Sequence, residues 1–258
     1  MMEVFDYCIE IVSGERGLTF SPNSPLRILS DGLNGFDMVD FSVDFGYYLD
    51  GRGAFVKKVG FRERMLGIRF EIGEEDAKWR REILGIAKPG KECMITAVFG
   101  GVCRRIEAIV SEKVKFEWES GWNRTVVSLR FAACEPFFMG DTVVADRLSE
   151  PLNNSGDVPC GAVFTVRAAG GSVVNPSISR GGDTFSVEAV LEDGDVAVID
   201  TRDGRKGISI NGEACYSFDW MSRFFRLDVG ENVLSADADS GKEFMAVHAA
   251  FAPLYYGV

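Results

Sequence analysis

Residues 185–204 read FSVEAVLEDGDVAVIDTRDG, and this stretch indicates the fold class. Residues 185–191 carry an apolar side chain at every second position, which is the period of a strand with one buried face. The run 196–200 (VAVID) is typical of a second strand. Turn signals follow each run, at Asp193-Gly194 and at Asp203-Gly204. The stretch therefore predicts short strands joined by turns.

The same pattern recurs along most of the chain. Further strands are predicted at 95–99 (ITAVF), 114–118 (VKFEW), 127–131 (VSLRF), 163–167 (VFTVR) and 224–229 (FFRLDV). Asn211-Gly212 and Asp203-Gly204 suit tight hairpins, because both central residues of such turns need a positive φ. This spacing of strands and turns is that of barrels and sandwiches, so the fold is predicted to be mainly β.

One segment predicts a helix. Residues 74–88 (EEDAKWRREILGIAK) are rich in helix formers, and acids open the segment, where the positive end of the helix dipole favours them. Trp79, Ile83 and Ile86 fall on one apolar stripe. Pro89 follows with a glycine and ends the helix. We expect about four turns packed on a sheet.

A long arm is predicted just before this helix. Residues 45–60 (FGYYLDGRGAFVKKVG) hold four glycines and four aromatics, a composition that favours a long hairpin or loop over core. Exposed aromatic clusters mark contacts between proteins. We therefore take Tyr47, Tyr48 and Phe55 as candidates for contact between subunits.

Length and charge predict two domains. The chain has 258 residues, enough for one large domain or two ordinary ones. Residues 1–135 hold 19 basic and 21 acidic groups, whereas residues 136–258 hold 9 and 18, so the second part carries most of the net charge of −11. The polar segment 149–161 (SEPLNNSGDVPCG) is typical of a surface loop. We place the boundary near 135–150.

Composition excludes several classes of protein. A net charge of −11 disfavours specific binding to nucleic acid or to an anionic membrane. No run of 18 apolar residues exists, and the N-terminus lacks the basic start of a signal peptide, so a cytoplasmic origin is expected. The single histidine, His248, predicts a satisfied strand residue, and the six cysteines predict small buried side chains. No catalytic, cofactor or metal site is predicted.

Paired carboxylates are the one pattern that could serve an enzyme. A glycosidase needs two close carboxyl groups, one with a raised pKa. Acids gather at Glu188, Glu192, Asp193, Asp195, Asp200 and Asp203. Several of them adjoin glycines in predicted turns, where acids are ordinary. A polysaccharide-degrading enzyme is therefore kept only as a minor hypothesis.

Five segments, taken in order, resemble the distal tail protein family of long-tailed, non-contractile bacteriophages. They are 131–138 (FAACEPFF), 156–179 (GDVPCGAVFTVRAAGGSVVNPSIS), 196–200 (VAVID) followed by Thr201, 227–232 (LDVGEN) and 254–257 (LYYG). Each is weak alone, and their order and spacing carry the match. Cys160 departs from the family, which often has a bulky apolar residue there.

The resemblance implies a structural protein and not an enzyme. It implies an N-terminal β-barrel-like domain with one helix (1–135) and a C-terminal galectin-like β-sandwich (136–258). Six copies would form a ring that joins the tail tube to the tip or baseplate and lets DNA pass through its lumen. The sandwich could receive receptor-binding proteins. The place implied is the virion tail, assembled in the cytoplasm of the host bacterium.

Two further expectations accompany this interpretation. The lumen of the ring should carry no continuous basic track, since such a track would retain passing DNA. As an alternative function, the C-terminal sandwich could be a carbohydrate-binding module that recognises host-surface glycan. That alternative needs exposed aromatics, for which Tyr216 and Trp220 are the candidates.

Overall fold

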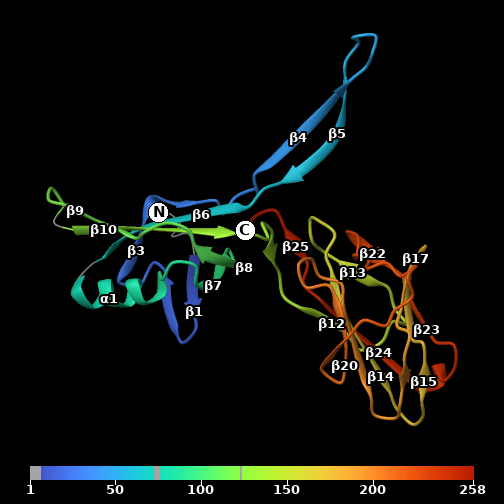
Figure 1. Ribbon diagram of the computed structural model, residues 1–258. Coiled ribbons are helices and arrows are strands. Elements are labelled where there is room, and N and C mark those ends of the chain that lie inside the picture. The colour runs from blue at the N-terminus through green and yellow to red at the C-terminus, as the bar shows by residue number, and fades with distance from the viewer. Residues whose placement is uncertain (1–6, 73–75, 123) are drawn as a thin grey trace. The chain divides into compact units, whose positions relative to one another are not determined.

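The structure is a computed structural model that describes residues 7–72, 76–122 and 124–258 (Figure 1). The chain divides into two compact units, one of Met1–Met139 with Tyr255–Val258 and one of Gly140–Leu254. The last four residues thus return to the first unit. Both units are built of strands, and the described residues contain one α-helix. The predicted mainly β class is confirmed.

The first unit is built on one antiparallel sheet with the strand order β2-β1-β7-β8-β10-β6-β3. Its strands are β1 (Tyr7–Ser13), β2 (Arg16–Phe20), β3 (Leu26–Asn34), β6 (Arg64–Ile72), β7 (Glu92–Phe99), β8 (Val102–Val110) and β10 (Arg124–Ala133). Three more strands join it at the sides: β9 (Lys115–Glu119), β11 (Phe138–Met139) and β25 (Leu254–Tyr255). The end strands β2 and β3 contact each other, so the sheet curls round its apolar core.

Alternation along the strands places that core. In β6 the residues Leu66, Ile68 and Phe70 are buried, while the intervening residues point to the other face. Phe70 packs edge-on against Phe20 of β2, with ring centroids 4.8 Å apart. Side chains from opposite ends of the sheet therefore fill one core.

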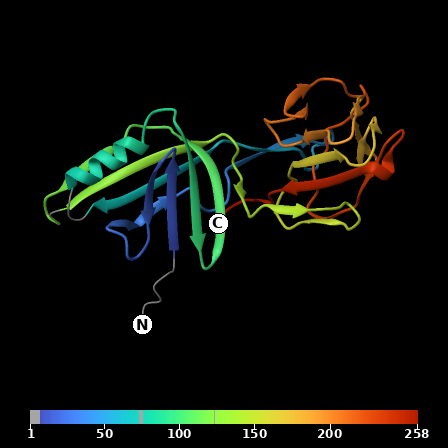
Figure 2. The same ribbon diagram turned by 90° about the horizontal axis from the view of Figure 1, so that it is seen from below.

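The helix α1 (Asp76–Ile86) covers this core (Figure 2). Ile83 and Ile86 are buried and Trp79 packs beside them, as the apolar stripe predicts. The helix is two residues shorter at its C-terminal end than the predicted 74–88, because Lys88 donates to Ile86 O in a turn rather than continuing the helix. The predicted N-terminal acids Glu74 and Glu75 lie outside the described residues.

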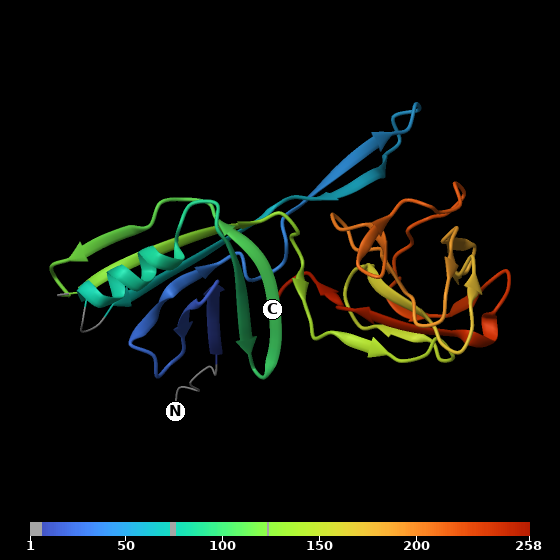
Figure 3. The same cartoon turned by 60° about the horizontal axis from the view of Figure 1, so that its bottom comes forward.

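The second unit packs two main sheets face to face (Figure 3). The six-stranded sheet runs β12 (Val143–Ala145), β24 (Met245–Phe251), β14 (Ala162–Ala168), β19 (Val196–Asp200), β20 (Gly207–Ile210) and β21 (Glu213–Cys215). The three-stranded sheet runs β17 (Asp183–Ser186), β16 (Ser177–Arg180) and β23 (Leu234–Asp237). Phe164 and Ala249 from the first sheet share one core with Ile178 and Phe185 from the second.

Short elements complete this unit. They are β13 (Leu152–Asn154) paired with β22 (Gly230–Asn232), β15 (Val173–Val174) paired with β18 (Val190–Leu191), and the 3₁₀ turn η1 (Lys242–Phe244). Asn211 and Gly212 join β20 to β21 with φ of 53° and 84°, so the predicted tight hairpin is confirmed. Asp203-Gly204 is different. It lies in a longer loop between Asp200 and Gly207, and the prediction of a two-residue turn there was wrong.

Two strand predictions in this unit also need correction. Residues 185–191 bury Phe185, Val187 and Leu191 as predicted, but they form two strands, because β17 pairs with β16 and β18 pairs with β15. Alternation in the sequence predicts which face of a strand is buried. It does not predict which other strand forms the backbone hydrogen bonds.

Residues 224–229 form no strand. The Asn232 side chain accepts from Asp228 N and donates to Asp228 O, both at 2.8 Å, so these backbone groups are bonded locally. Within 224–229, Leu227 alone forms a β-bridge to another described segment, and its partner is Cys160.

The cysteines are less uniform than predicted. Cys93 and Cys160 are buried, and burial raises the pKa of each thiol to about 11. Cys134 is exposed, so the expectation that all six are buried was wrong. Iodoacetamide at neutral pH should therefore modify Cys134 in the folded protein and reach Cys93 and Cys160 only after denaturation, as peptide mass spectrometry can show. Equal rates at Cys93 and Cys134 in the folded chain would contradict this burial.

Candidate assembly surfaces

The predicted arm is a separate two-stranded sheet. Strand β4 (Phe41–Tyr47) pairs with β5 (Ala54–Phe61), and the part of the chain that the structure describes adds no third strand to this sheet (Figure 1). We call residues 41–61 the arm. Its strands extend four residues further toward the N-terminus than the predicted 45–60.

The arm has one apolar face. Directly paired residues share a face, and successive pairs alternate between faces. The pairs on one face are Phe41–Phe61, Val43–Val59, Phe45–Val56 and Tyr47–Ala54. The pairs on the other are Ser42–Gly60, Asp44–Lys58 and Gly46–Phe55. A shift in register between Asp44 and Phe45 keeps Val56 opposite Phe45. We call the first set the apolar face of the arm.

No segment among the described residues covers this face along most of its length. Phe41, Phe45, Tyr47, Val56 and Val59 are all exposed, Tyr47 to 77 %. An isolated two-stranded hairpin is marginally stable in water, and contiguous exposed apolar patches mark interaction sites. The apolar face of the arm is therefore a candidate interaction surface.

The foot of the arm is fixed firmly. Phe61 at the end of the apolar face packs against Phe137 at a centroid distance of 5.0 Å and against Tyr256 at 5.7 Å. Val39 N, just before the arm, donates to Tyr256 O at 3.0 Å. The foot of the arm therefore contacts both segments that end the first unit's parts of the chain. Phe137 lies just before Met139, and Tyr256 lies in the last four residues.

Arg64 ties these segments together. Its side chain donates to Pro136 O at 2.6 Å, to Gly35 O at 2.7 Å, to Asp37 O at 2.9 Å, and to Tyr256 O. The guanidinium also lies over the Phe138 ring at 4.7 Å. Only 2 % of Arg64 is exposed, and this burial lowers its pKa to about 10, partly offset by Asp40 and Asp37. The group stays charged at neutral pH, and its donors satisfy four carbonyls.

The three predicted contact residues occupy different places. Tyr47 lies on the apolar face. Phe55 lies on the other face over Gly46, where a Cβ would come within 2.4 Å of the ring, and Tyr48 packs on Phe55 at 5.4 Å. Tyr48 and Phe55 therefore pack within the arm.

The candidates Tyr47, Tyr48 and Phe55 leave out the residues that make up most of the apolar face. These are Phe41, Val43, Phe45, Val56 and Val59. The signal was present, because 41–47 (FSVDFGY) alternates apolar and small or polar residues.

The two glycan candidates of the second unit are exposed. Tyr216 and Trp220 are exposed to 86 % and 87 % on the loop after β21. This loop is held to β17, since Asp219 N donates to Ser186 O at 3.2 Å and Ser186 N donates to Ser222 Oγ at 2.9 Å. The rings lie on a loop and not on a sheet face.

The carboxylates of this unit act as turn and ion-pair groups. Asp195 accepts from Asn211 Nδ2 at 2.8 Å and from Glu192 N at 2.8 Å, and these bonds lower its pKa. Asp200 has a lowered pKa because the bonds from Arg202 outweigh its partial burial. A glycosidase acid needs the opposite shift. These two residues therefore do not fit that role.

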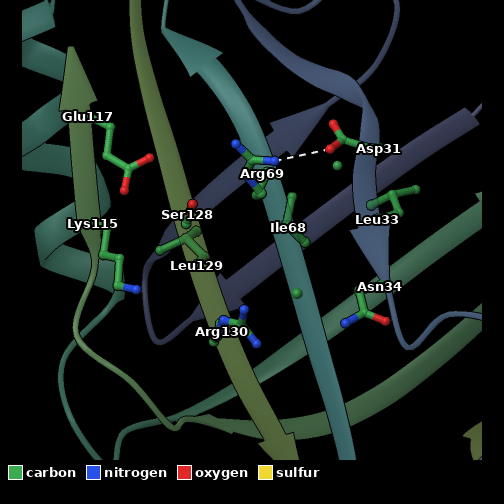
Figure 4. A pocket seen from close by; sticks show the side chains of 12 residues that line it. Asp31, Leu33, Asn34, Ile68, Arg69, Lys115, Glu117, Ser128, Leu129 and Arg130 are labelled. Carbon is green, nitrogen blue, oxygen red and sulfur yellow. Dashed lines mark hydrogen bonds and ion pairs between the residues drawn. The ribbon is translucent and has the colours of Figure 1, made fainter. Parts of the chain in front are cut away.

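A hollow of about 530 Å³ lies on the outer face of the first unit's sheet (Figure 4). Gly32 permits the close approach of β3 to β6, because a Cβ there would lie 2.2 Å from Arg69 O. The charges that line the hollow have both signs, and Arg69 pairs with Asp31 at 3.1 Å. The hollow is a mixed-charge surface and not a basic one.

The described residues contain neither a metal-binding cluster nor a membrane-spanning helix. No cluster of three or more His, Cys, Asp or Glu side chains in these ranges could hold a metal ion. The α-helix found there is too short and too polar to cross a membrane.

Comparison with known proteins finds one matching family and several similar solved structures. Residues 155–255 match the family described as siphovirus-type tail component, C-terminal domain. A comparison with curated protein sequences finds no match. Among solved structures, SPP1 Dit is described as a paradigm of the hub adsorption apparatus in phages that infect Gram-positive bacteria. It matches with TM-score 0.69 and 12 % identity over 95 % of this chain and 98 % of that one.

Two phage baseplate structures match less closely. The phage P2 baseplate in its activated conformation with Ca gives TM-score 0.57 at 6 % identity, over 95 % of this chain and 97 % of that one. The form with Sr gives 0.53 at 8 %, with the same coverage. The matched family is one of tail components, which are structural rather than catalytic, in agreement with the expectation of no enzyme. Residues 155–255 therefore match the siphovirus-type tail component family, and the chain as a whole is similar in fold to SPP1 Dit.

Proposed function

We propose that this protein is a structural hub of a phage or prophage tail. Six copies form a ring that joins the tail tube to the tip or baseplate, in the virion tail, after assembly in the host cytoplasm. The observation that carries the proposal is the uncovered apolar face of the arm. The family match and the likeness to SPP1 Dit supply the setting.

The arm is suited to close a ring. A ring uses a heterologous contact, in which one surface of a subunit binds a different surface of the next. The arm carries its apolar face on a ribbon separate from the main sheet, while Arg64 and the Phe61 cluster hold its foot. In this proposal the apolar face of each arm binds the neighbouring copy.

Charge fits passage of DNA through the ring. The unequal charge of the two parts places most of the net −11 in the second unit, which keeps the outer domains soluble and apart. The arginines of the mixed-charge sheet face are paired, Arg69 with Asp31, Arg124 with Glu71, and Arg130 with Glu112 at 3.6 Å. We propose that DNA passes without specific binding, and that the second units receive receptor-binding proteins.

Hydrogen exchange tests the proposed role of the arm. In the assembled species, the amides of 41–47 and 54–61 should exchange at least about tenfold more slowly than in the monomer, because burial of the apolar face suppresses opening of the hairpin. Strand β24 pairs along its length with β14 in a separate core, and it serves as the internal control. Unchanged exchange of the arm on assembly would contradict its role.

A carbohydrate-binding module is the second candidate. The exposure of Tyr216 and Trp220 favours it, since an exposed ring on a held loop can stack on a sugar. If the second unit binds glycan, Trp220→Ala should abolish binding on a glycan array. Trp122→Ala removes another highly exposed ring, from the first unit, and should leave binding intact. No binding by the wild type would eliminate this candidate.

A further inference from the structure

Strand β24 has two unequal edges. Along one edge, all seven residues from Met245 to Phe251 pair with β14. Along the other, β12 pairs only with Ala249, Ala250 and Phe251. Residues 245–248 therefore have no partner strand on that side among the described residues.

The backbone groups on this edge can be assigned. Phe244 O accepts from Ala169 N, next to β14, and Pro253 O accepts from Gly140 N, next to β12. In an antiparallel strand, alternate residues direct their N–H and C=O to opposite edges. Val247 therefore presents both its N–H and its C=O to the open edge. Met245 presents only its C=O there, because Met245 N donates to Lys242 O.

A hollow of about 540 Å³ lies beside this open edge. After Ala145 the chain no longer pairs with β24, and Asp146, Arg147 and Leu148 line the hollow. Its floor includes Leu148, Ala236 and Met245, and all three pack against the core of the second unit. The hollow therefore exposes apolar side chains that also pack against the core of the second unit.

The sheet opposite is also unpaired at this point. Ala236 belongs to β23, which pairs with β16 and with no second strand in the described ranges. Both sheets of the sandwich therefore end at this hollow. Unpaired strand edges are templates for pairing with another chain, and natural proteins usually block them.

The charge of the hollow indicates what could bind. Asp146 lies 3.5 Å from His248 Nδ1, and Lys242 pairs with Asp237 at 3.1 Å. Arg147 is exposed and has no ion-pair partner among the residues that the structure describes. This site thus offers an unpaired cation in a unit that is otherwise acidic.

We propose that the open edge of β24 at residues 245–248 accepts an extended, acidic segment of another tail protein as an added strand. Val247 would bond the backbone of the guest, and alternate apolar side chains would fill the floor over Leu148, Ala236 and Met245. A carboxylate of the guest would pair with Arg147. This is strand addition, in which main-chain bonds give affinity and alternate side chains give specificity. The site lies wholly in the second unit and does not depend on ring formation.

Peptide titration of the full-length protein tests the proposal. The probe is the acetylated and amidated heptapeptide Thr-Val-Glu-Val-Thr-Val-Glu, added to isotope-labelled protein and followed through its backbone amide resonances. Shifts should be centred on 245–248. The matched peptide with lysine for glutamate should bind at least about tenfold more weakly, and so should a peptide N-methylated at alternate residues, because each loses a charge-assisted or main-chain bond.

Two variants sharpen the test. Arg147→Glu should reverse the preference in favour of the lysine peptide, and because Arg147 is exposed the fold should persist. Arg223→Glu makes the same charge change at an exposed site that does not line the hollow, and it should leave the preference unchanged.

Three results would overturn the proposal. The first is the absence of shifts at 245–248 with about 1 mM acidic peptide. The second is equal binding of the N-methylated peptide. The third is a concentration-dependent shift of 245–248 without peptide, which would identify a second copy of the chain as the occupant.

Discussion

Replacing Arg64 with alanine should lower the free energy of unfolding of the first unit by about 3–5 kcal/mol. The substitution removes donors to the carbonyls of Gly35, Asp37, Pro136 and Tyr256. It also leaves a cavity beside Phe138, over which the guanidinium lies. Buried acceptors without donors are costly, and these four come from three separate segments.

Urea unfolding measures this effect cleanly in a Trp220→Phe background. The remaining tryptophans Trp79, Trp118 and Trp122 all lie in the first unit, so their fluorescence reports on that unit alone. Arg62→Ala is the matched control, because Arg62 is exposed two residues away and should change stability by no more than about 0.5 kcal/mol. Arg64→Lys keeps the charge but not the planar fork, and it should fall between the two. Equal stability of Arg64→Ala and Arg62→Ala would refute the role of Arg64.

Placing a charge on the apolar face of the arm should prevent formation of the proposed ring. We expect Phe45→Asp and Val43→Asp each to weaken the association of neighbouring copies by about 2–4 kcal/mol per interface, or roughly 30- to 1,000-fold. The reason is that each variant removes an apolar contact and buries a carboxylate without a partner. Sedimentation velocity would show loss of the assembled species.

Ser42→Asp is the matched control. Ser42 neighbours Val43 on the same strand but lies on the opposite face of the arm. The same charge there should leave assembly intact, since that face already carries Asp44 and Lys58. Dissociation by Ser42→Asp to the same extent as by Val43→Asp would show that added negative charge, and not the apolar face, is responsible.

Local patterns predicted the elements that depend on local physics. The apolar stripe of Trp79, Ile83 and Ile86 gave the helix and its buried face. The alternating run 196–200 corresponds to β19 residue for residue. Asn211-Gly212 gave its turn because the requirement for positive φ lies in the two residues themselves.

Features that depend on distant segments could not be predicted in this way. Arg64 stands between Glu63 and Met65 and resembles an ordinary solvated arginine. Its burial results from carbonyls that the chain brings from as far as Tyr256. The missing strand at 224–229 has a local cause instead, because the side chain of Asn232, four residues further on, takes the backbone groups of Asp228, and the alternation of apolar residues does not indicate this.

The arm combines a feature that the sequence predicted with one that it could not predict. Its composition predicted a long hairpin or loop outside the core, and the paired register then placed Tyr47 on the apolar face. The packing of Phe55 over Gly46 depends on cross-strand register, which the sequence does not reveal.

Absolute mass in solution tests the central claim most directly. Light scattering over a range of concentrations, with electron microscopy of the largest species, should show six copies of the 28.4 kDa chain, or about 170 kDa, as a ring with a central hole. A monomer of 28.4 kDa at every concentration, with no ring on the grid, would contradict the account.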